Sequence, residues 1–139
     1  MIILDTNVLS ALMQREPDAD LIDWLDEQPS ESIWTTAITV FEVRFGIDVL
    51  AHGRRRRQLD EAFDVALAED LGARVLPFDE IAARTAGSIA AREREAGRTI
   101  EIRDAEIAGI AAARKATLAT RNTRHFAKTG IKLVNPWGS

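Results

Sequence analysis

Short runs of β-branched and other apolar residues alternate along this chain with longer segments in which apolar residues have helical spacing. The first run is Ile2–Leu4, and the segment Thr6–Met13 then carries Val8, Leu9 and Leu12 with helical spacing. Because two parallel strands must be joined by a crossover, usually a helix, this alternation predicts a parallel sheet covered by helices on both faces. We therefore expect a three-layer α/β/α fold with a central parallel sheet of about four to five short strands.

The later segments repeat this alternation. Strands are expected at residues 32–35, 74–76, 117–120 and 131–134, and helices at residues 20–25, 37–50, 55–71, 79–97 and 103–115. Thr35 or Thr36 can cap the helix at 37–50, and Asp79 can cap the helix after Pro77. The helix at 37–50 has two apolar stripes, which predicts burial on two sides. One stripe is Ile38, Phe41, Phe45 and Val49, and the other is Val40, Val43, Ile47 and Leu50.

Length and composition exclude several classes of protein. The 139 residues fit a single domain, residues 1–139, and the absence of Cys excludes disulfide and zinc-thiolate frameworks. The apolar run before Asp5 is too short for a secretory signal. The longest stretch without charge, Ser32–Phe41, is about half of the roughly 20 residues that a membrane span needs. We expect a cytoplasmic protein that does not associate with membranes.

The charge balance argues against a protein that coats nucleic acid with its whole surface. The chain has 18 Lys and Arg against 22 Asp and Glu, a net charge of −4. Local basic patches are still compatible with this balance. The most basic run, Arg54–Arg57, is expected to be the solvated start of a helix, in which Arg56 pairs with Asp60 and Arg57 with Glu61.

Three acidic residues are candidates for chemistry. Asp5 directly follows the first strand, at the edge where parallel sheets form ligand sites. Glu42 borders an apolar stripe of its helix, which is an unusual place for an unpaired carboxylate, and Asp104 lies in a first helical turn. Each also has an ordinary interpretation: Asp5 as a helix cap, Glu42 as the partner of an arginine such as Arg44, and Asp104 as a charge favoured by the helix dipole. Together, carboxylates with almost no His or Cys are what Mg²⁺ or Mn²⁺ requires.

The sequence also resembles a known family over essentially the whole chain. The similarity rests on these segments: Leu4–Val8, Ala37–Gly46, Leu76–Asp79, Arg103–Ala108, Leu118–Phe126 and Asn135–Trp137. Their order and spacing resemble the PIN-domain ribonucleases, within them the VapC toxins, and most closely the FitB-like branch. The resemblance implies a Mg²⁺-dependent endoribonuclease of a type II toxin–antitoxin pair, which hydrolyses RNA phosphodiester bonds with metal-activated water.

The resemblance further implies roles for individual residues. Asp5, Glu42 and Asp104 are expected to be catalytic metal ligands, with Mg²⁺ as the cofactor and Mn²⁺ as its substitute. Thr6, Asn7 and Thr120 are expected to support the site.

The fourth acid of the family is missing. Relatives carry it at the position of Asn122 or at that of His125, and this chain has an acid at neither. We expect Asn122 to take part in catalysis through its neutral amide oxygen, so that the site carries about one negative charge fewer and a second metal ion binds weakly. His125 is expected either to contact phosphate or to pack beside Phe126.

RNA contacts are expected from basic residues in segments that begin at the catalytic edge, although each is equally compatible with an ordinary surface charge. These residues are Arg103, Arg121, Arg124 and Lys128. The tryptophans Trp24, Trp34 and Trp137 are assigned to packing rather than to base stacking.

Partners are expected mainly from the resemblance. They are a small inhibitory antitoxin of the VapB or FitA type and a second copy of the chain, in a heterotetramer or larger complex that contacts DNA only through the antitoxin. Apolar residues beyond what one helix face needs, at Leu9, Leu12 and Leu50, give weak support for an interface.

Two other functions compete with this interpretation. Haloacid dehalogenase-like phosphatases also use an Asp after the first strand, but they need a second Asp two residues later, where this chain has Asn7. The other alternative is a degenerate PIN domain that no longer cleaves and acts only by binding its antitoxin in a DNA-bound regulatory complex. The missing fourth acid favours that alternative, and the presence of Asp5, Glu42 and Asp104 together opposes it.

Overall fold

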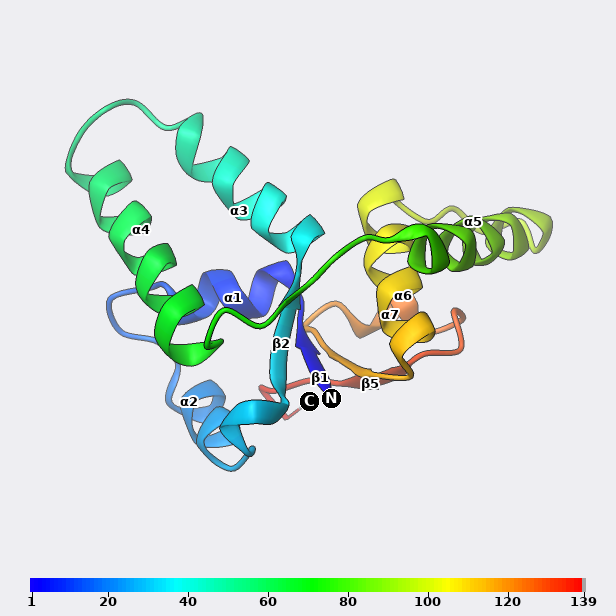
Figure 1. Cartoon of the computed structure of the whole chain (residues 1–139), viewed down its shortest axis with the longest axis horizontal. Helices are drawn as coiled ribbons and strands as arrows, with labels where there is room; N and C mark the ends of the chain where they lie inside the picture. The colour runs from blue at the N-terminus through cyan, green and yellow to red at the C-terminus, as the bar shows by residue number, and fades with distance from the viewer. Residues whose placement is uncertain (139) are drawn as a thin grey trace.

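The computed structural model describes residues 1–138. Within them, five strands form one all-parallel sheet in the order β3-β2-β1-β4-β5. The strands are β1 (Ile2–Leu4), β2 (Ile33–Thr36), β3 (Val75–Leu76), β4 (Thr117–Ala119) and β5 (Lys132–Val134). Figure 1 shows helices on both sides of this sheet, so the predicted three-layer α/β/α fold is confirmed.

The helices divide into two groups along the chain. One group is α1 (Thr6–Leu12), α2 (Ala19–Asp26), α3 (Ala37–Asp48) and α4 (Arg54–Val65), and the other is α5 (Glu80–Glu95), α6 (Ile102–Arg114) and α7 (Thr123–Phe126), as Figure 1 shows. A 3-10 turn, Ser30–Ser32, precedes β2, and α4 continues into a π-helical turn, Ala66–Asp70.

Successive side chains along a strand point to opposite faces of the sheet, so each group of helices packs against its own hydrophobic core. Leu4 and Ala119 pack with residues of α1–α4, whereas Ile3 and Leu118 pack with residues of α5–α7. These four residues are fully buried, which explains why the strands read as continuous apolar runs. The predicted packing role of the tryptophans is confirmed, because Trp24 and Trp137 lie against the first core and Trp34 against the second.

Parallel register brings the carboxyl ends of the central strands together. Leu4 is paired with Ala119, and the backbone N–H of Asp5 donates to the carbonyl of Ala119 at 2.9 Å. Thr36 ends β2 at the same edge and caps α3, since its hydroxyl accepts a hydrogen bond from the N–H of Thr39. The residues that follow β1, β2 and β4 therefore meet at one edge of the sheet.

The prediction that α3 is buried on two sides is wrong. Phe41, Phe45 and Val49 are 60%, 57% and 64% exposed, and the two phenyl rings stack on each other with centroids 6.3 Å apart. Only the stripe through Val43 and Ile47 is fully buried. The physical reason is that α3 projects beyond the short strand β2, so that the sheet does not cover its second face (Figure 1).

Leu9, Leu12 and Leu50, which were predicted to exceed what one helix face needs, are not exposed in the structure. Leu9 is fully buried, Leu12 packs against the first core, and Leu50 is half-buried. These positions are therefore used within the chain, and its exposed apolar surface lies instead on residues such as Phe41 and Phe45.

The ion pairs predicted within the Arg54–Arg57 run are replaced by pairs between helices. Arg44 on α3 contacts Asp60 on α4 at 2.8 Å, and Arg56 lies 3.5 Å from Asp48 on α3. These pairs link α4 to α3, a tertiary arrangement that spacing within one helix does not reveal. Among residues 1–138, no helix combines the length and the apolar character needed to cross a membrane.

The close packing of α5 against α6 depends on Gly109. A Cβ added there would lie 2.5 Å from the Cβ of Ala86 and 2.6 Å from the carbonyl oxygen of Ala82. We expect Gly109→Ala to lower the free energy of unfolding by about 1–3 kcal/mol, because overpacking outweighs the better helix propensity of Ala. Urea denaturation would measure this.

Gly87 on α5 is the matched control, because a Cβ there meets nothing within 4 Å. We expect Gly87→Ala to be neutral or to stabilise the protein by up to about 1 kcal/mol. Equal stability changes for the two variants would contradict the proposed helix contact.

Candidate active site

Asp5 occupies the centre of the edge formed by β1 and β4. Its Oδ1 accepts a hydrogen bond from the N–H of Thr6 at 2.8 Å, and its Oδ2 accepts from the hydroxyl of Thr120 at 2.8 Å and from Nδ2 of Asn7 at 3.2 Å. Asp5 is only 5% exposed, so these donors offset the cost of burying its charge. It is both the cap of α1 and the most deeply placed acid of the site.

Asn7 on α1 and Thr120 directly after β4 both donate hydrogen bonds to Asp5. Asn7 Nδ2 also donates to the hydroxyl of Thr120 at 3.2 Å, while Asn7 Oδ1 accepts from the N–H of Arg121 at 3.0 Å. The Thr120 oxygen in turn accepts from the N–H of Asn122 at 3.0 Å. This network fixes the loop after β4 against the start of α1.

Glu42 extends toward the same edge from α3. Its Oε1 accepts a hydrogen bond from the hydroxyl of Thr6 at 2.9 Å, and its Oε2 lies 3.8 Å from the guanidinium of Arg103. Arg44, the partner suggested by sequence, instead contacts Asp48 and Asp60. That suggestion is wrong because Arg44 lies two residues from Glu42 and therefore on a different side of α3.

Thr39 is a site residue that the sequence analysis did not identify. It is fully buried, and its hydroxyl lies 3.1 Å from that of Thr6 and 3.4 Å from that of Thr36. This chain of hydroxyls orients Thr6 toward Glu42. A polar residue one helical turn before Glu42 was the signal available in the sequence.

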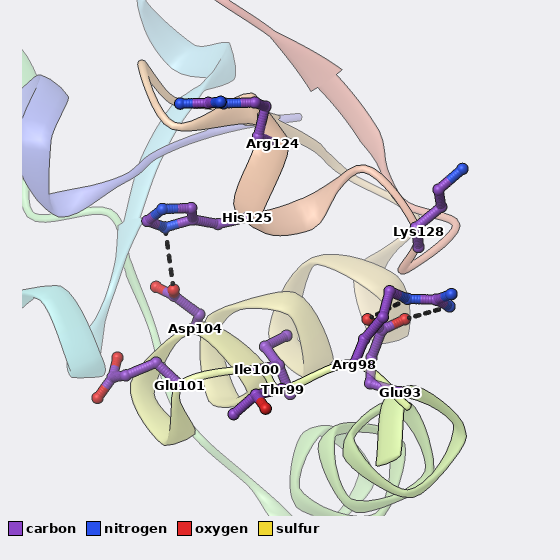
Figure 2. Close-up of a pocket in the computed structure, with 9 residues that line it drawn as sticks. All are labelled: Glu93, Arg98, Thr99, Ile100, Glu101, Asp104, Arg124, His125 and Lys128. Atoms are coloured by element: carbon purple, nitrogen blue, oxygen red, sulfur yellow. Dashed lines mark hydrogen bonds and ion pairs between the residues drawn. The ribbon is translucent and has the colours of Figure 1, made fainter. Parts of the chain in front are cut away.

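Asp104 enters the site from the first turn of α6. Nδ1 of His125 lies 3.5 Å from its Oδ2, and Figure 2 shows the imidazole directly facing this carboxylate. Glu101, three residues earlier, is a further acid that the sequence analysis missed, and it contributes negative charge near both Asp104 and Glu42.

Burial raises the pKa of all three acids, and neighbouring acids raise those of Asp104 and Glu42 further. Burial, together with Asp5 and Glu101, raises the pKa of Asp104 to about 6. Burial also raises the pKa of Glu42, against the hydrogen bond from Thr6, and it raises the pKa of Asp5, against the bonds from Thr120 and Thr6. Negative charge is therefore concentrated here at a cost in free energy.

The side chains at this edge are of the types that bind a hard divalent cation, but they are farther apart than the ligands of one bound ion. Among residues 1–138, no three His, Asp or Glu side chains are gathered closely enough to ligate one ion as they stand. The groups that meet are carboxylates supported by hydroxyls and an amide, which are ligands typical of Mg²⁺. A cation would also remove the repulsion that raises the pKa of Asp104.

The predicted fourth position contributes no carboxylate. Asn122 is exposed, and its bond to Thr120 comes from its backbone rather than from its amide. His125 is exposed as well, yet it contacts Asp104, so it lies at the site without packing into the core as Phe126 does.

The four basic residues predicted to bind RNA lie in different surroundings. Arg103 is held between Glu42 and Glu101, and the guanidinium of Arg121 stacks on Trp137 at 3.8 Å from the ring centroid. Arg124 and Lys128 line a cavity beside Asp104. The structure therefore brings two of the four to an open surface next to the acids.

A family model described as the PIN domain matches residues 2–132. The chain belongs to the PIN domain family. It is 41% identical to the plasmid stability protein StbB of Pseudomonas syringae pv. tomato, over 99% of both chains. It is 39% identical to the VapC ribonuclease Y4jK of Sinorhizobium fredii, over 99% of this chain and 98% of that protein.

Solved structures of PIN-domain relatives have the same fold. The crystal structure of FitAcB from Neisseria gonorrhoeae contains a chain that is 34% identical and superposes with a TM-score of 0.88, over 99% of both chains. FitAB has also been solved bound to an IR36 DNA fragment, with a TM-score of 0.89. The predicted resemblance to the VapC and FitB-like proteins is confirmed.

The charge concentration at this PIN-domain site has a consequence for stability. Because folding raises the pKa of Asp104 to about 6, its ionised form opposes folding above that pH, and the penalty fades as pH falls toward the ordinary value of 3.8. We expect Asp104→Asn to stabilise the protein in EDTA at pH 7.5, by on the order of 1 kcal/mol, and by about half as much at pH 5.

Asp23→Asn on the exposed face of α2 is the control, expected to stay within about 0.5 kcal/mol of the parent at both pH values. Urea denaturation at the two pH values makes the measurement. A loss of stability in Asp104→Asn at pH 7.5 would show that His125 and the helix dipole outweigh the repulsion.

Proposed function

We propose that this chain is the toxin of a VapBC-like type II toxin–antitoxin pair and acts as a Mg²⁺-dependent endoribonuclease. The observation that carries the proposal is that Asp5, Glu42 and Asp104 lie at one edge of the sheet, where burial raises the pKa of each and neighbouring acids add to the rise for Glu42 and Asp104. A site with only a structural role does not need such a concentration of negative charge. The similarity to the VapC ribonuclease Y4jK supports RNA as the substrate.

In this proposal Asp5, Glu42 and Asp104 hold Mg²⁺, or Mn²⁺ in its place. The bound ion supplies an activated water and stabilises the charge that develops on the phosphodiester. Thr120 and Asn7 orient the carboxylate of Asp5, and Thr6 orients that of Glu42. Asn122 supplies an uncharged oxygen near the fourth position and is the weakest of the proposed catalytic groups.

The proposed partner is a small antitoxin of the VapB or FitA type. Related FitAB and VapBC complexes support it, and those solved with DNA fragments support DNA contact through the antitoxin. We propose a homodimeric toxin in a heterotetramer or larger assembly, and a cytoplasmic location. The exposed apolar side chains on α3 are typical of chains that assemble.

The competing function is an inactive PIN domain that only binds its antitoxin. The exposed, uncharged Asn122 at the fourth position is the observation in its favour. The retained hydrogen-bond network around Asp5 argues against it, because a binding role does not require a buried carboxylate with several dedicated donors.

The deciding assay is cleavage of total small RNA by the purified chain without antitoxin. We expect discrete fragments with Mg²⁺ or Mn²⁺ and none with EDTA, and Asp104→Asn should lower the rate at least about 100-fold because a metal ligand is lost. Asp23→Asn should cleave at the parent rate. Absence of cleavage by folded parent protein with either metal would favour the inactive, antitoxin-binding alternative.

The neutral Asn122 leads to a separate expectation for metal binding. We expect calorimetric titration with Mn²⁺ to show one tighter and one weaker site, and Asn122→Asp to tighten the weaker site at least about 10-fold by adding a carboxylate ligand. Asn122→Ala serves as the control for loss of the amide and should not tighten it. Two equally tight sites in the parent protein would contradict this account.

A further inference from the structure

A cavity of about 560 Å³ adjoins Asp104 and continues away from Asp5 and Glu42. It lies between residues 98–101 of the α5–α6 connection, the first turn of α6 and the segment that includes α7, as Figure 2 shows. Its volume is within the range of about 300–1,000 Å³ that is typical of small-molecule sites. The cavity is therefore large enough for one nucleotide unit.

Two cations on the α7 side of this cavity are not neutralised. The side chains of Arg124 and Lys128 line it, and neither forms a hydrogen bond or an ion pair with another residue of the described 1–138. Figure 2 shows both side chains on the segment that also carries His125, with their charged ends on opposite sides of α7 and directed away from each other. They are therefore available to an anionic ligand.

The acids of the same cavity are already engaged. Glu93 is held by Arg98 through contacts of 2.9 and 3.1 Å, and Glu101 accepts from Arg103 at 3.4 Å. Asp104 faces His125 and belongs to the proposed metal site. The free charge of the cavity is therefore positive on the side of Arg124 and Lys128.

The opposite wall is held in a fixed position. The side chain of Glu93 is only 8% exposed, and the backbone N–H of Arg98 also donates to the carbonyl of Glu93 at 2.8 Å. Gly97, with φ of +75°, makes the turn that allows this closure. The connection thereby presents Thr99 and Ile100 as a wall without free charge.

We propose that this cavity is a subsite for the nucleotide of the RNA strand that neighbours the scissile phosphate. The phosphates that flank this nucleotide lie against Arg124 on one side and Lys128 on the other, and the base packs against Ile100. The inference rests on the proposed ribonuclease function and adds to it the direction in which the RNA strand leaves the catalytic acids.

The test uses a 5′-fluorescein single-stranded RNA 20-mer of mixed sequence and measures its Kd by anisotropy in EDTA at low salt, where metal-dependent cleavage is absent. We expect the double variant Arg124→Glu/Lys128→Glu to raise Kd at least about 10-fold and to reduce the slope of log K against log salt by roughly 1. The control double variant Arg54→Glu/Arg114→Glu makes the same change of charge at exposed residues outside the cavity and should change Kd less than about 3-fold.

An unchanged Kd and salt slope in the Arg124/Lys128 variant, or an equal loss in the control, would overturn the subsite. Inorganic polyphosphate of equal charge should compete at least about 10-fold less well than unlabelled RNA, and equal competition would overturn the role of the base. Cleavage of RNA by the parent protein in Mg²⁺ is measured in a separate assay, which tests the proposed function independently of the subsite. Cleavage with an unchanged variant Kd rejects only the subsite, whereas absence of both RNA binding and cleavage in the parent rejects the proposed function as well.

Discussion

The hydrogen bonds that converge on the buried carboxylate of Asp5 join the parts of the molecule on which the candidate site depends. Thr6 and Asn7 belong to α1, and Thr120 follows β4, so one side chain ties together β1, the first helix and the neighbouring strand. This convergence requires the parallel register in which Leu4 is paired with Ala119. A slip of one residue would turn Asp5 toward the other face of the sheet and would break both the cap and the network.

The sequence was sufficient for elements whose cause is local. The alternation of apolar runs predicts the strands, and side chains such as those of Thr36 and Asp79 mark helix starts that the structure confirms. It failed on α3, where helical periodicity identified two apolar stripes but could not show that the sheet ends before it covers Phe41 and Phe45. Exposure depends on what lies opposite a helix, and this information is not contained in the helix itself.

The candidate site shows the same division. Asp5 could be proposed from its place after a strand, Asp104 from the first turn of a helix and Glu42 from its place beside an apolar stripe. The electrostatic coupling of these acids agrees with that proposal. The contact between Thr39 and Thr6 and the contact between His125 and Asp104 could not be predicted, because each depends on two segments that meet only in the folded chain. The partner of Glu42 was misassigned for the same reason, since Arg103 reaches it from α6.

The neutral residue at the fourth position has a physical logic in this arrangement. Burial and the neighbouring acids already raise the pKa of Asp104 to about 6, so a further carboxylate at Asn122 would add to the repulsion whenever no cation is bound. With an amide there, and with His125 beside Asp104, the metal-free fold carries less unfavourable charge. The expected cost is weaker attraction for a second ion. If the adjoining cavity receives the neighbouring nucleotide, the phosphates that flank it lie near Arg124 and Lys128, so the RNA itself is positioned by charges outside the acidic cluster. The site then separates metal binding from substrate binding, with the acids on one side of Asp104 and the free cations on the other.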